Sequence, residues 1–273
     1  MRTIYNIIGV AIISLLSCAK VVAADAKTTA EAYWAEAIAA YEAKDYGLAV
    51  ERFEQIVELR YLSGDLYYNL ANSYFKLGEQ ASEEGLHKFS NGELGRAVLN
   101  YHRALRLDPT LEDARYNLEL AVDHTNDTDA LPESFMVTVW RNMSNMAQSN
   151  SWALSSLVMI GMVLALIIFY LLSNSIMLRR ISFFGAIIFI IGVIIVVALA
   201  LYSKRQSEED NRAVVICNDT TSVHASPDSG SKVIRQPSQG VTVRVSRDHG
   251  EWSEIIFADG EKGWIRSAKI ENI

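Results

Sequence analysis

The stretch that decides the fold is split in two: YYNLANSYFKLG over residues 67–78 and AVLNYHRALRLDP over residues 97–109. In both parts, large apolar or aromatic residues and small residues recur at helical spacing. The second part ends at Pro109, which cannot continue a helix. We expect two antiparallel helices, with alanines such as Ala71 and Ala104 allowing close approach and the large side chains filling the space between.

Similar helix pairs surround this unit at a period of about 34 residues, which indicates stacked helical repeats. An earlier, divergent unit spans residues 30–63 and places Tyr33, Ala37, Ala49 and Phe53 in corresponding positions. After the central unit, residues 112–123 repeat only the first helix, in Ala114-Arg115-Tyr116-Asn117-Leu118. We expect that last helix to cap the array.

The central unit resembles a tetratricopeptide repeat, with aromatic, Leu, small and Tyr positions on its first helix and the closing Asp108-Pro109 on its second. The resemblance implies an α-solenoid over residues 25–130 whose first helices line a partner-binding groove. The groove positions implied are Trp34, Ile38, Tyr41, Tyr68, Asn72, Phe75, Lys76 and Tyr116. Because basic residues are nearly absent from this set, a helix or an extended apolar segment suits the groove better than a free C-terminal carboxylate.

An insertion near residues 79–92 breaks the repeat period between the two helices of the central unit. Its content of Gly, Ser and Asn is typical of a solvated surface loop. A dedicated binding loop is the alternative.

The first 24 residues have the composition of an export signal. A basic Met1-Arg2 start precedes an apolar run from Ile4 to Ser17, and small residues follow as far as Ala24. We expect cleavage after Ala24. In the alternative interpretation the segment is a lipoprotein signal and Cys18 is acylated. Both interpretations export the rest of the chain.

Two apolar segments, residues 152–172 and 181–202, are each long enough to cross about 30 Å of hydrocarbon as a helix and contain no charged residue. The connector, residues 173–180, carries Arg179-Arg180 and is expected on the cytoplasmic side. With the export signal, this predicts a two-pass protein of the bacterial inner membrane with both soluble parts in the periplasm. Since neither span carries an ionisable residue, we interpret the pair as an anchor rather than an ion pathway.

Residues 131–151, just before the first span, carry large apolar side chains at helical spacing. Such a connector is expected either to lie along the membrane surface or to pack as a final helix against the repeats.

After a linker over residues 203–211, the segment 212–273 changes to short alternating runs separated by Gly, Pro and Asp. Asp259-Gly260 predicts a hairpin turn. The order of these strands and turns resembles a bacterial SH3-like domain, a small β-barrel, which implies binding of cell-wall peptides. The family's Val-Arg-x-Gly-Pro loop is altered here, since His224 and Ser226 replace its Arg and Gly. Trp252 and Trp264 are the candidates for a ligand face, although a barrel this small is expected to use at least one of them in its core.

Several functional classes are disfavoured by composition. The net charge of −7 and the lack of a basic stripe argue against nucleic acid. The five histidines are scattered, and no metal-binding, phosphate-binding or nucleophile motif is present, so we expect no catalytic residues, no metal and no cofactor. Cys217 lies in an apolar run and is expected to be a buried, unreactive side chain.

The complete order of segments is export signal, helical repeats, two-helix anchor and SH3-like domain. It resembles the E-type proteins of the Bat aerotolerance operon family. The resemblance implies a membrane-anchored scaffold with protein partners, namely membrane proteins with von Willebrand A domains and a MoxR-type ATPase, in envelope maintenance or oxidative-stress tolerance. A peptidoglycan-binding role through the SH3-like domain is the alternative. A regulator or sensor of an enzyme is a third.

Overall fold

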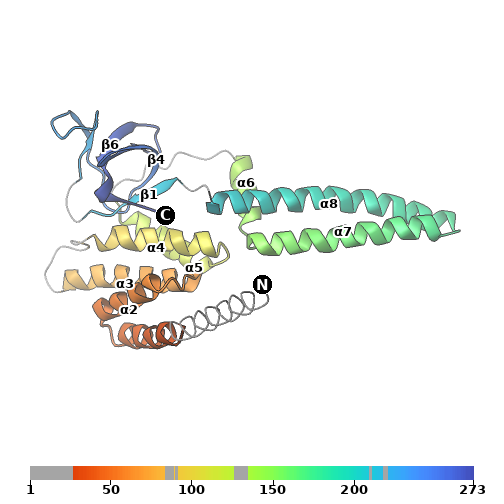
Figure 1. Cartoon of the computed structure of the whole chain (residues 1–273), viewed down its shortest axis with the longest axis horizontal. Coiled ribbons are helices and arrows are strands. Elements are labelled where there is room, and N and C mark those ends of the chain that lie inside the picture. Colours follow the sequence, from red (N-terminus) through yellow and green to blue (C-terminus); the bar gives the residue numbers. More distant parts are fainter. Residues whose placement is uncertain (1–26, 84–88, 90–91, 126–134, 209–210, 218–220) are drawn as a thin grey trace, which may run out of the picture.

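The computed structural model describes residues 27–83, 89, 92–125, 135–208, 211–217 and 221–273. These residues form a helical array, two long apolar helices and a C-terminal β domain (Figure 1). The predicted export signal, including Cys18, and part of the 79–92 insertion lie outside the described residues.

The helical array consists of a helix over residues 27–42, α2 (Tyr46–Glu58), α3 (Gly64–Glu83), α4 (Glu93–Leu107) and α5 (Glu112–Asp123). The helices pack in chain order, α2 on α3, α3 on α4 and α4 on α5. The predicted helix pairs and the single helix after them are therefore present.

Two of these helices, α2 and α3, begin with a short polar side chain that accepts a hydrogen bond from a backbone N–H of the first turn. Asp45 Oδ1 accepts a hydrogen bond from the Leu48 backbone N–H at 3.1 Å, and Ser63 Oγ accepts one from Leu66 N–H at 3.1 Å. Both bonds satisfy amides that have no partner within the helix. At the other end, α4 stops at Leu107, just before Pro109, as predicted.

The core of the array follows the small and large pattern of the sequence. Ala71, Ala97 and Ala104 have no exposed surface, and they lie among large side chains such as Phe53 and Tyr101 that are also almost completely buried. Small residues at the contacts bring the helix axes together, and the aromatic rings fill the remaining volume.

The described residues of the insertion differ from a fully solvated loop at two places. Helix α3 continues through the predicted break to Glu83. Phe89 is buried, and a Cβ added to Gly78 would lie 2.1 Å from its ring. The absent side chain at Gly78 therefore makes room for Phe89. The expectation of a solvated loop is wrong at these two places because Phe89 supplies apolar surface to the array.

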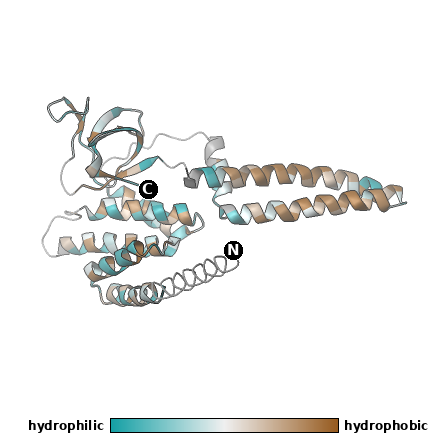
Figure 2. Cartoon of the chain, in the orientation of Figure 1, coloured by the Kyte–Doolittle hydropathy of each residue, from teal (hydrophilic) through white to brown (hydrophobic). Residues whose placement is uncertain are grey.

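Beyond the array, α6 (Phe135–Ser144) leads into the long helices α7 (Ser149–Leu172) and α8 (Ile176–Glu208). The long helices lie side by side, are brown with apolar residues along most of their length, and extend away from the rest of the molecule (Figure 2). By length and composition, Asn150–Leu172 and Ile176–Arg205 are candidate membrane spans.

Two details of this region differ from the sequence expectation. The turn between α7 and α8 is shorter than the predicted connector, because Arg179 and Arg180 already belong to the first turns of α8. In addition, α6 packs against α8, where Trp140 meets Tyr202 edge to face at 6.5 Å. The sequence predicted that residues 131–151 lie along the membrane surface or pack against the repeats. Neither prediction includes this contact with α8.

A glycine supports the close contact of the long helices. A Cβ at Gly192 would lie 2.4 Å from Met159 Cε, so the missing side chain leaves room for the end of the Met159 side chain between α7 and α8. Gly185 has a looser environment, with the nearest atom, Leu166 Cδ1, at 3.5 Å from a Cβ.

The β domain is one antiparallel sheet of order β3-β2-β6-β5-β4-β1-β7. Its strands are β1 (Arg212–Val215), β2 (Val223–His224), β3 (Val233–Arg235), β4 (Thr242–His249), β5 (Trp252–Ile256), β6 (Lys262–Arg266) and β7 (Ile270–Asn272), with the short helix η1 (Ser267–Lys269) before β7. The predicted Asp259-Gly260 turn joins β5 to β6, with Gly260 at φ 87°. Cys217 is buried in the sheet's core, as predicted.

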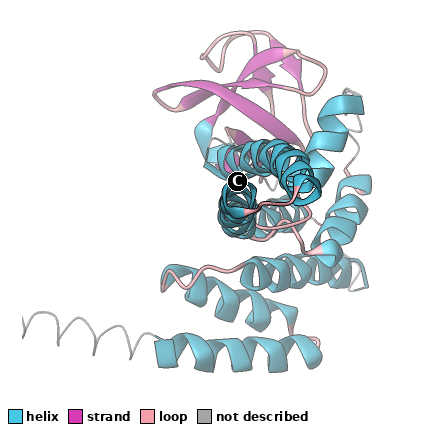
Figure 3. Cartoon of the chain, turned by 90° about the vertical axis from the view of Figure 1, so that its right-hand side faces the viewer, coloured by secondary structure: helices cyan, strands magenta, loops and turns pink. Residues whose placement is uncertain are grey.

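The β domain is packed directly onto the helical array. Val214 of β1 and Ile273, next to β7, belong to the same buried cluster as the residues of α3 and α4. Gly95 of α4 faces the β1 backbone, since a Cβ there would lie 2.6 Å from Val215 O. Arg103 of α4 pairs with Glu271 at 2.8 Å. The two soluble parts thus form one unit at the same end of α7 and α8 (Figures 1 and 3).

Candidate functional site

A hydrogen-bonded cluster joins three helices of the array. The Tyr101 hydroxyl on α4 donates to Asn72 Oδ1 on α3 at 2.6 Å, and the side-chain amide of Asn117 on α5 donates to the same oxygen at 2.9 Å. Tyr68, one turn before Asn72, places its ring 6.4 Å from that of Tyr101. The amide of Asn72 is therefore held in one orientation by bonds from two other helices.

Charged and aromatic side chains surround this cluster. Burial raises the pKa of Tyr41, on the helix over residues 27–42, and nearby Lys76 opposes this rise. Lys76 itself donates to Glu79 Oε2 at 2.8 Å, a bond that raises the pKa of the lysine. We use the name tyrosine–asparagine surface for Tyr41, Tyr68, Asn72, Lys76 and Asn117, together with the exposed Tyr116, which precedes Asn117 on α5.

The predicted groove residues divide into three groups. Tyr41, Tyr68 and Asn72 are half-buried, and Lys76 and Tyr116 are exposed, with Tyr116 reaching 69%. These five belong to the surface just defined. Trp34 and Ile38 are partly buried against the core, where the Trp34 ring meets Phe53 edge to face at 5.5 Å.

Phe75 requires a correction, because only 7% of it is exposed. Its ring packs 5.3 Å from Phe89 and 5.5 Å from His124. It therefore belongs to the core, in contact with Phe89 and His124, and is removed from the candidate surface. No pattern in the sequence indicates that Phe89 packs on Phe75 of α3.

Sequence reasoning also missed two members of the site. Tyr101 is one of the large side chains expected only to fill the space between the helices, yet its hydroxyl anchors Asn72. Asn117 was noted only as part of a capping helix. Its position in the repeated first-helix motif, corresponding to Asn69 in the central unit, was the available signal.

The outer face of the β domain presents a second candidate site. Strand pairing puts Trp252 opposite both His249 and Arg266, and Glu254 opposite both Arg247 and Trp264. Side chains of directly paired residues lie on the same face of a sheet, whereas Ser253, Ile255 and Ile265 alternate to the opposite, buried face. Trp252 and Trp264 are both half-buried. The expectation that at least one fills the core is wrong, because aliphatic side chains such as Ile255, Ile265 and Val223 fill it instead.

Each tryptophan on this face has one cationic and one imidazole neighbour. Arg266 lies 5.3 Å from the Trp252 ring centre, and Arg247 lies 5.8 Å from that of Trp264. His224 meets Trp252 and His249 meets Trp264, both edge to face. Arg247 also makes bonds of 2.8 and 3.0 Å to the two carboxylate oxygens of Glu254, which lowers the pKa of Glu254. We call Trp252, Trp264, Arg247, Arg266, His224 and His249 the tryptophan face.

The described part of the chain contains no group of three or more His, Cys, Asp or Glu side chains placed to hold a metal ion. The two surfaces above are built from aromatic, amide and guanidinium groups, which are suited to binding a partner chain or a polar ligand.

The small antiparallel sheet, its short strands and its bulge near Val245 define an SH3-like β domain. Residues 219–271 match the family described as the bacterial SH3 domain. The C-terminal part of this chain is thus a bacterial SH3 domain, and the folded unit also includes β1, which precedes the matched range. Comparison of the chain with curated proteins and with solved structures gave no match.

Proposed function

We propose that this protein is a membrane-anchored adaptor that binds a protein partner on the tyrosine–asparagine surface of its helical repeats. The observation that carries the proposal is the convergence of Tyr101 and Asn117 on Asn72, since two donors from different helices orient one amide among aromatic side chains. Preorganised polar groups within an aromatic patch are typical of the residues that dominate binding energy in protein interfaces. In this proposal the protein acts by binding and catalyses no reaction.

The helical array is interpreted as a tetratricopeptide α-solenoid. The residue pattern of the central unit, the pairing of its helices and its buried alanines support this interpretation. The first helices of the repeats would then carry the partner surface, and α4, a second helix, would carry the SH3 domain on its other side. This arrangement leaves Tyr41, Tyr68 and Tyr116 available to a partner while the SH3 domain is docked.

The anchor is the pair α7 and α8, and we propose that both soluble parts are periplasmic. Packing of the SH3 domain on α4 supports a same-side arrangement, because two domains in contact occupy one compartment. The exposure of the apolar side chains along both helices supports a lipid environment. Because the predicted export signal directs the chain across the inner membrane, we propose that this compartment is the periplasm.

The order of segments supports a place in a Bat-type system for envelope maintenance or oxidative-stress tolerance. The partners expected on that basis are membrane proteins with von Willebrand A domains and a MoxR-type ATPase system. A membrane-embedded partner would meet the adaptor close to the bilayer, where α4 of the array contacts α8.

The test is capture of partners from membranes by the full-length protein, followed by their identification. We expect Tyr68→Ala and Asn72→Ala to reduce capture, and we expect Tyr61→Ala, an exposed tyrosine outside the surface, to leave it unchanged. Circular dichroism of each variant checks that the array remains folded. Equal capture by wild type and both surface variants would contradict the proposal. Point variants are preferred to deletion of residues 212–273, because that deletion would uncover the buried contacts of α4.

Binding of peptidoglycan through the SH3 domain is the second candidate function. The tryptophan face favours it, because the two half-buried rings offer apolar contact to a stem peptide, and Arg247 and Arg266, which are paired with Glu254 and Glu251, keep further N–H groups that can donate to peptide carbonyls or carboxylates. The full-length protein should then sediment with purified peptidoglycan, and Trp264→Ala should weaken this binding while Val233→Ala, an exposed apolar control, should not. No sedimentation of the wild type would remove this candidate.

A further inference from the structure

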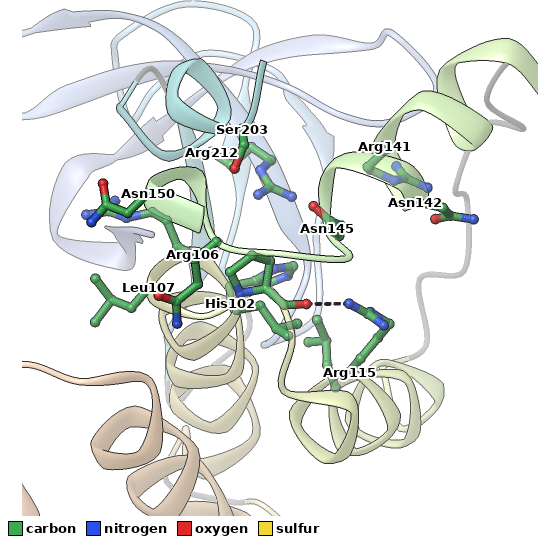
Figure 4. A pocket seen from close by; sticks show the side chains of 14 residues that line it. His102, Arg106, Leu107, Arg115, Arg141, Asn142, Asn145, Asn150, Ser203 and Arg212 are labelled. Carbon is green, nitrogen blue, oxygen red and sulfur yellow. Dashed lines mark hydrogen bonds between the residues drawn. The ribbon is translucent and has the colours of Figure 1, made fainter. Parts of the chain in front are cut away.

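Helix α4 borders two cavities that have no lining residue in common. One lies between α4, α5 and the segment that leads into α7, where Arg115 donates to the carbonyl oxygen of Pro109 at 2.6 Å (Figure 4). The other, of about 410 Å³, lies between α2, α3, α4 and β7. We name this second space the α2–α4 cavity.

The α2–α4 cavity lies on the side of α3 opposite to the tyrosine–asparagine surface. Its floor is formed by the buried side chains of Tyr67, Leu70 and Tyr74, which follow one another at intervals of three and four residues. This spacing puts the three on one face of the helix, whereas Tyr68 and Asn72 lie about half a turn around it. A ligand in the cavity would therefore not compete for the side chains of the proposed partner surface.

The wall formed by α4 contains a buried amide, that of Asn100, which is only 4% exposed. Its nitrogen donates to the carbonyl oxygen of Arg96 at 2.8 Å, one turn back in the same helix. Its Oδ1 accepts no hydrogen bond from a described residue and is not sealed within the protein, so it is reached from the cavity. Because buried amide oxygens normally accept a hydrogen bond, this atom is available to a donor that enters the cavity.

The opposite wall, formed by α2, carries two carboxylates one turn apart, Glu54 and Glu58. Glu54 accepts a hydrogen bond from the Tyr74 hydroxyl. Burial and this bond raise the pKa of Tyr74, so the hydroxyl stays a neutral donor that fixes the Glu54 carboxylate. The exposed side chain of Glu58 makes no hydrogen bond or ion pair with another described residue.

The two arginines that line the cavity are engaged by other groups. Arg103 pairs with Glu271 of β7 at 2.8 Å. Arg96 lies over the Tyr74 ring, 5.6 Å from its centre, and donates to the hydroxyl of the same residue at 3.4 Å. In the described part of the chain, Glu58 thus remains a lining carboxylate without a cationic partner.

We propose that the α2–α4 cavity binds a lysine side chain carried by a segment of a partner protein. An ammonium group has three N–H donors and no acceptor, which matches the Glu58 carboxylate and the Asn100 Oδ1. Because these acceptors lie on opposite walls, a compact ammonium group suits them better than a guanidinium, whose donors lie in one plane. The methylene groups of the lysine would pack on Tyr67 and Leu70.

This site is separate from the tyrosine–asparagine surface and from the membrane anchor, and the inference depends on neither. Since Glu271 belongs to the SH3 domain, the cavity is complete only when that domain is packed on α4. A partner segment bound there would contact two repeats and the SH3 domain together.

The test uses the full-length protein in deuterated detergent and saturation-transfer NMR with the probe acetyl-Gly-Ala-Lys-Ala-Gly-amide. We expect saturation of the lysine methylene protons, and we expect the peptide with glutamine in place of lysine to bind at least tenfold more weakly. Asn100→Ala should weaken binding of the lysine peptide roughly tenfold, because a hydrogen bond to a charged group is lost. Glu58→Gln should weaken it roughly threefold, the effect of losing an exposed ion pair.

The matched control is Glu42→Gln, which removes an exposed carboxylate at the end of the helix over residues 27–42 and should bind the peptide as the wild type does. Circular dichroism checks the fold of each variant. Asn100→Ala removes a bond within α4 and can disturb folding, so Glu58→Gln is the decisive variant, because its side chain makes no bond to another described residue.

Equal binding of the lysine peptide by the wild type and Glu58→Gln would overturn the proposal. Loss of binding in Tyr68→Ala without any effect of Glu58→Gln would assign the peptide to the tyrosine–asparagine surface, and would overturn it as well. Tighter binding of free cadaverine than of the lysine peptide, with the same sensitivity to Glu58→Gln, would assign the cavity to a small diamine and reject the partner segment.

Discussion

Gly95 offers a direct test of the contact between α4 and the SH3 domain. A Cβ at this position would lie 2.6 Å from Val215 O and 3.1 Å from Ile216 Cα, both main-chain atoms of the β domain. A flexible side chain can rotate away from an added methyl group, but the main chain cannot. Gly95→Ala should therefore push β1 away from α4.

The size of the effect follows from two opposing terms. Replacing a helical glycine by alanine ordinarily stabilises by at most about 1 kcal/mol. Overpacking a tight contact costs roughly 1–3 kcal/mol. Because the clashing atoms belong to the backbone, we take the upper part of that range and expect a net loss of about 1–2 kcal/mol for docking of the SH3 domain.

Hydrogen exchange of the detergent-solubilised full chain measures this loss locally. A loss of about 1–2 kcal/mol corresponds to roughly 5–30-fold faster exchange through local opening, and we expect it in β1 and β7. The matched control is Gly47→Ala, also near the N-terminal end of a helix, where the nearest atom to an added Cβ is Asp45 Oδ1 at 3.9 Å. This control should be neutral or slightly stabilising. Unchanged or slower exchange of β1 in Gly95→Ala would refute the packing argument.

Two further predictions concern the array and the anchor. Tyr101→Phe should cost about 0.5–1.5 kcal/mol in thermal unfolding through loss of the bond to Asn72. Burial raises the pKa of Tyr101 above its ordinary value of 10.0, so the stability it contributes is complete below that pH and falls as the pH rises further. Alkaline unfolding should therefore be less steep in the Phe variant, and identical pH profiles would count against the buried hydroxyl. Reporter fusions after residues 150 and 273 should both report the periplasm and a fusion at Asn174 the cytoplasm, whereas a cytoplasmic signal from residue 273 would reject the proposed topology.

The secondary structure was largely predictable because each signal acts locally. Pro109 ends a helix through its own ring, and Asp259-Gly260 forms its turn through local backbone preferences. The burial of Ala71 and Ala104 also followed from helical periodicity. The prediction that Cys217 lies in a core is confirmed, and it followed from the apolar run Ala213–Ile216 that precedes this residue.

The errors arose where residues distant in sequence meet. Phe75 has the periodicity of a groove residue, but Phe89 and His124 cover it from other segments. The tryptophans looked large enough to be needed in the core of the β domain, yet aliphatic side chains fill that space and leave both rings on the outer face. Such outcomes depend on which side chains compete for the same volume. The periodicity of one helix or strand does not indicate which side chain of another segment will occupy that volume.

The docking of the two soluble parts was the most consequential feature that the sequence did not predict. Residues 203–211 look like a linker between independent domains, and neither Gly95 nor Arg103 stands out within a helical repeat. Their importance comes from β1 and β7, which lie more than one hundred residues further along the chain. Because Arg103 pairs with Glu271 and Arg106 contacts Ile273, α4 links the array, which carries the tyrosine–asparagine surface, to the SH3 domain. A ligand of the tryptophan face and a partner on the tyrosine–asparagine surface would therefore bind two parts that are packed on each other, so that binding of either would restrict the orientation available to the other.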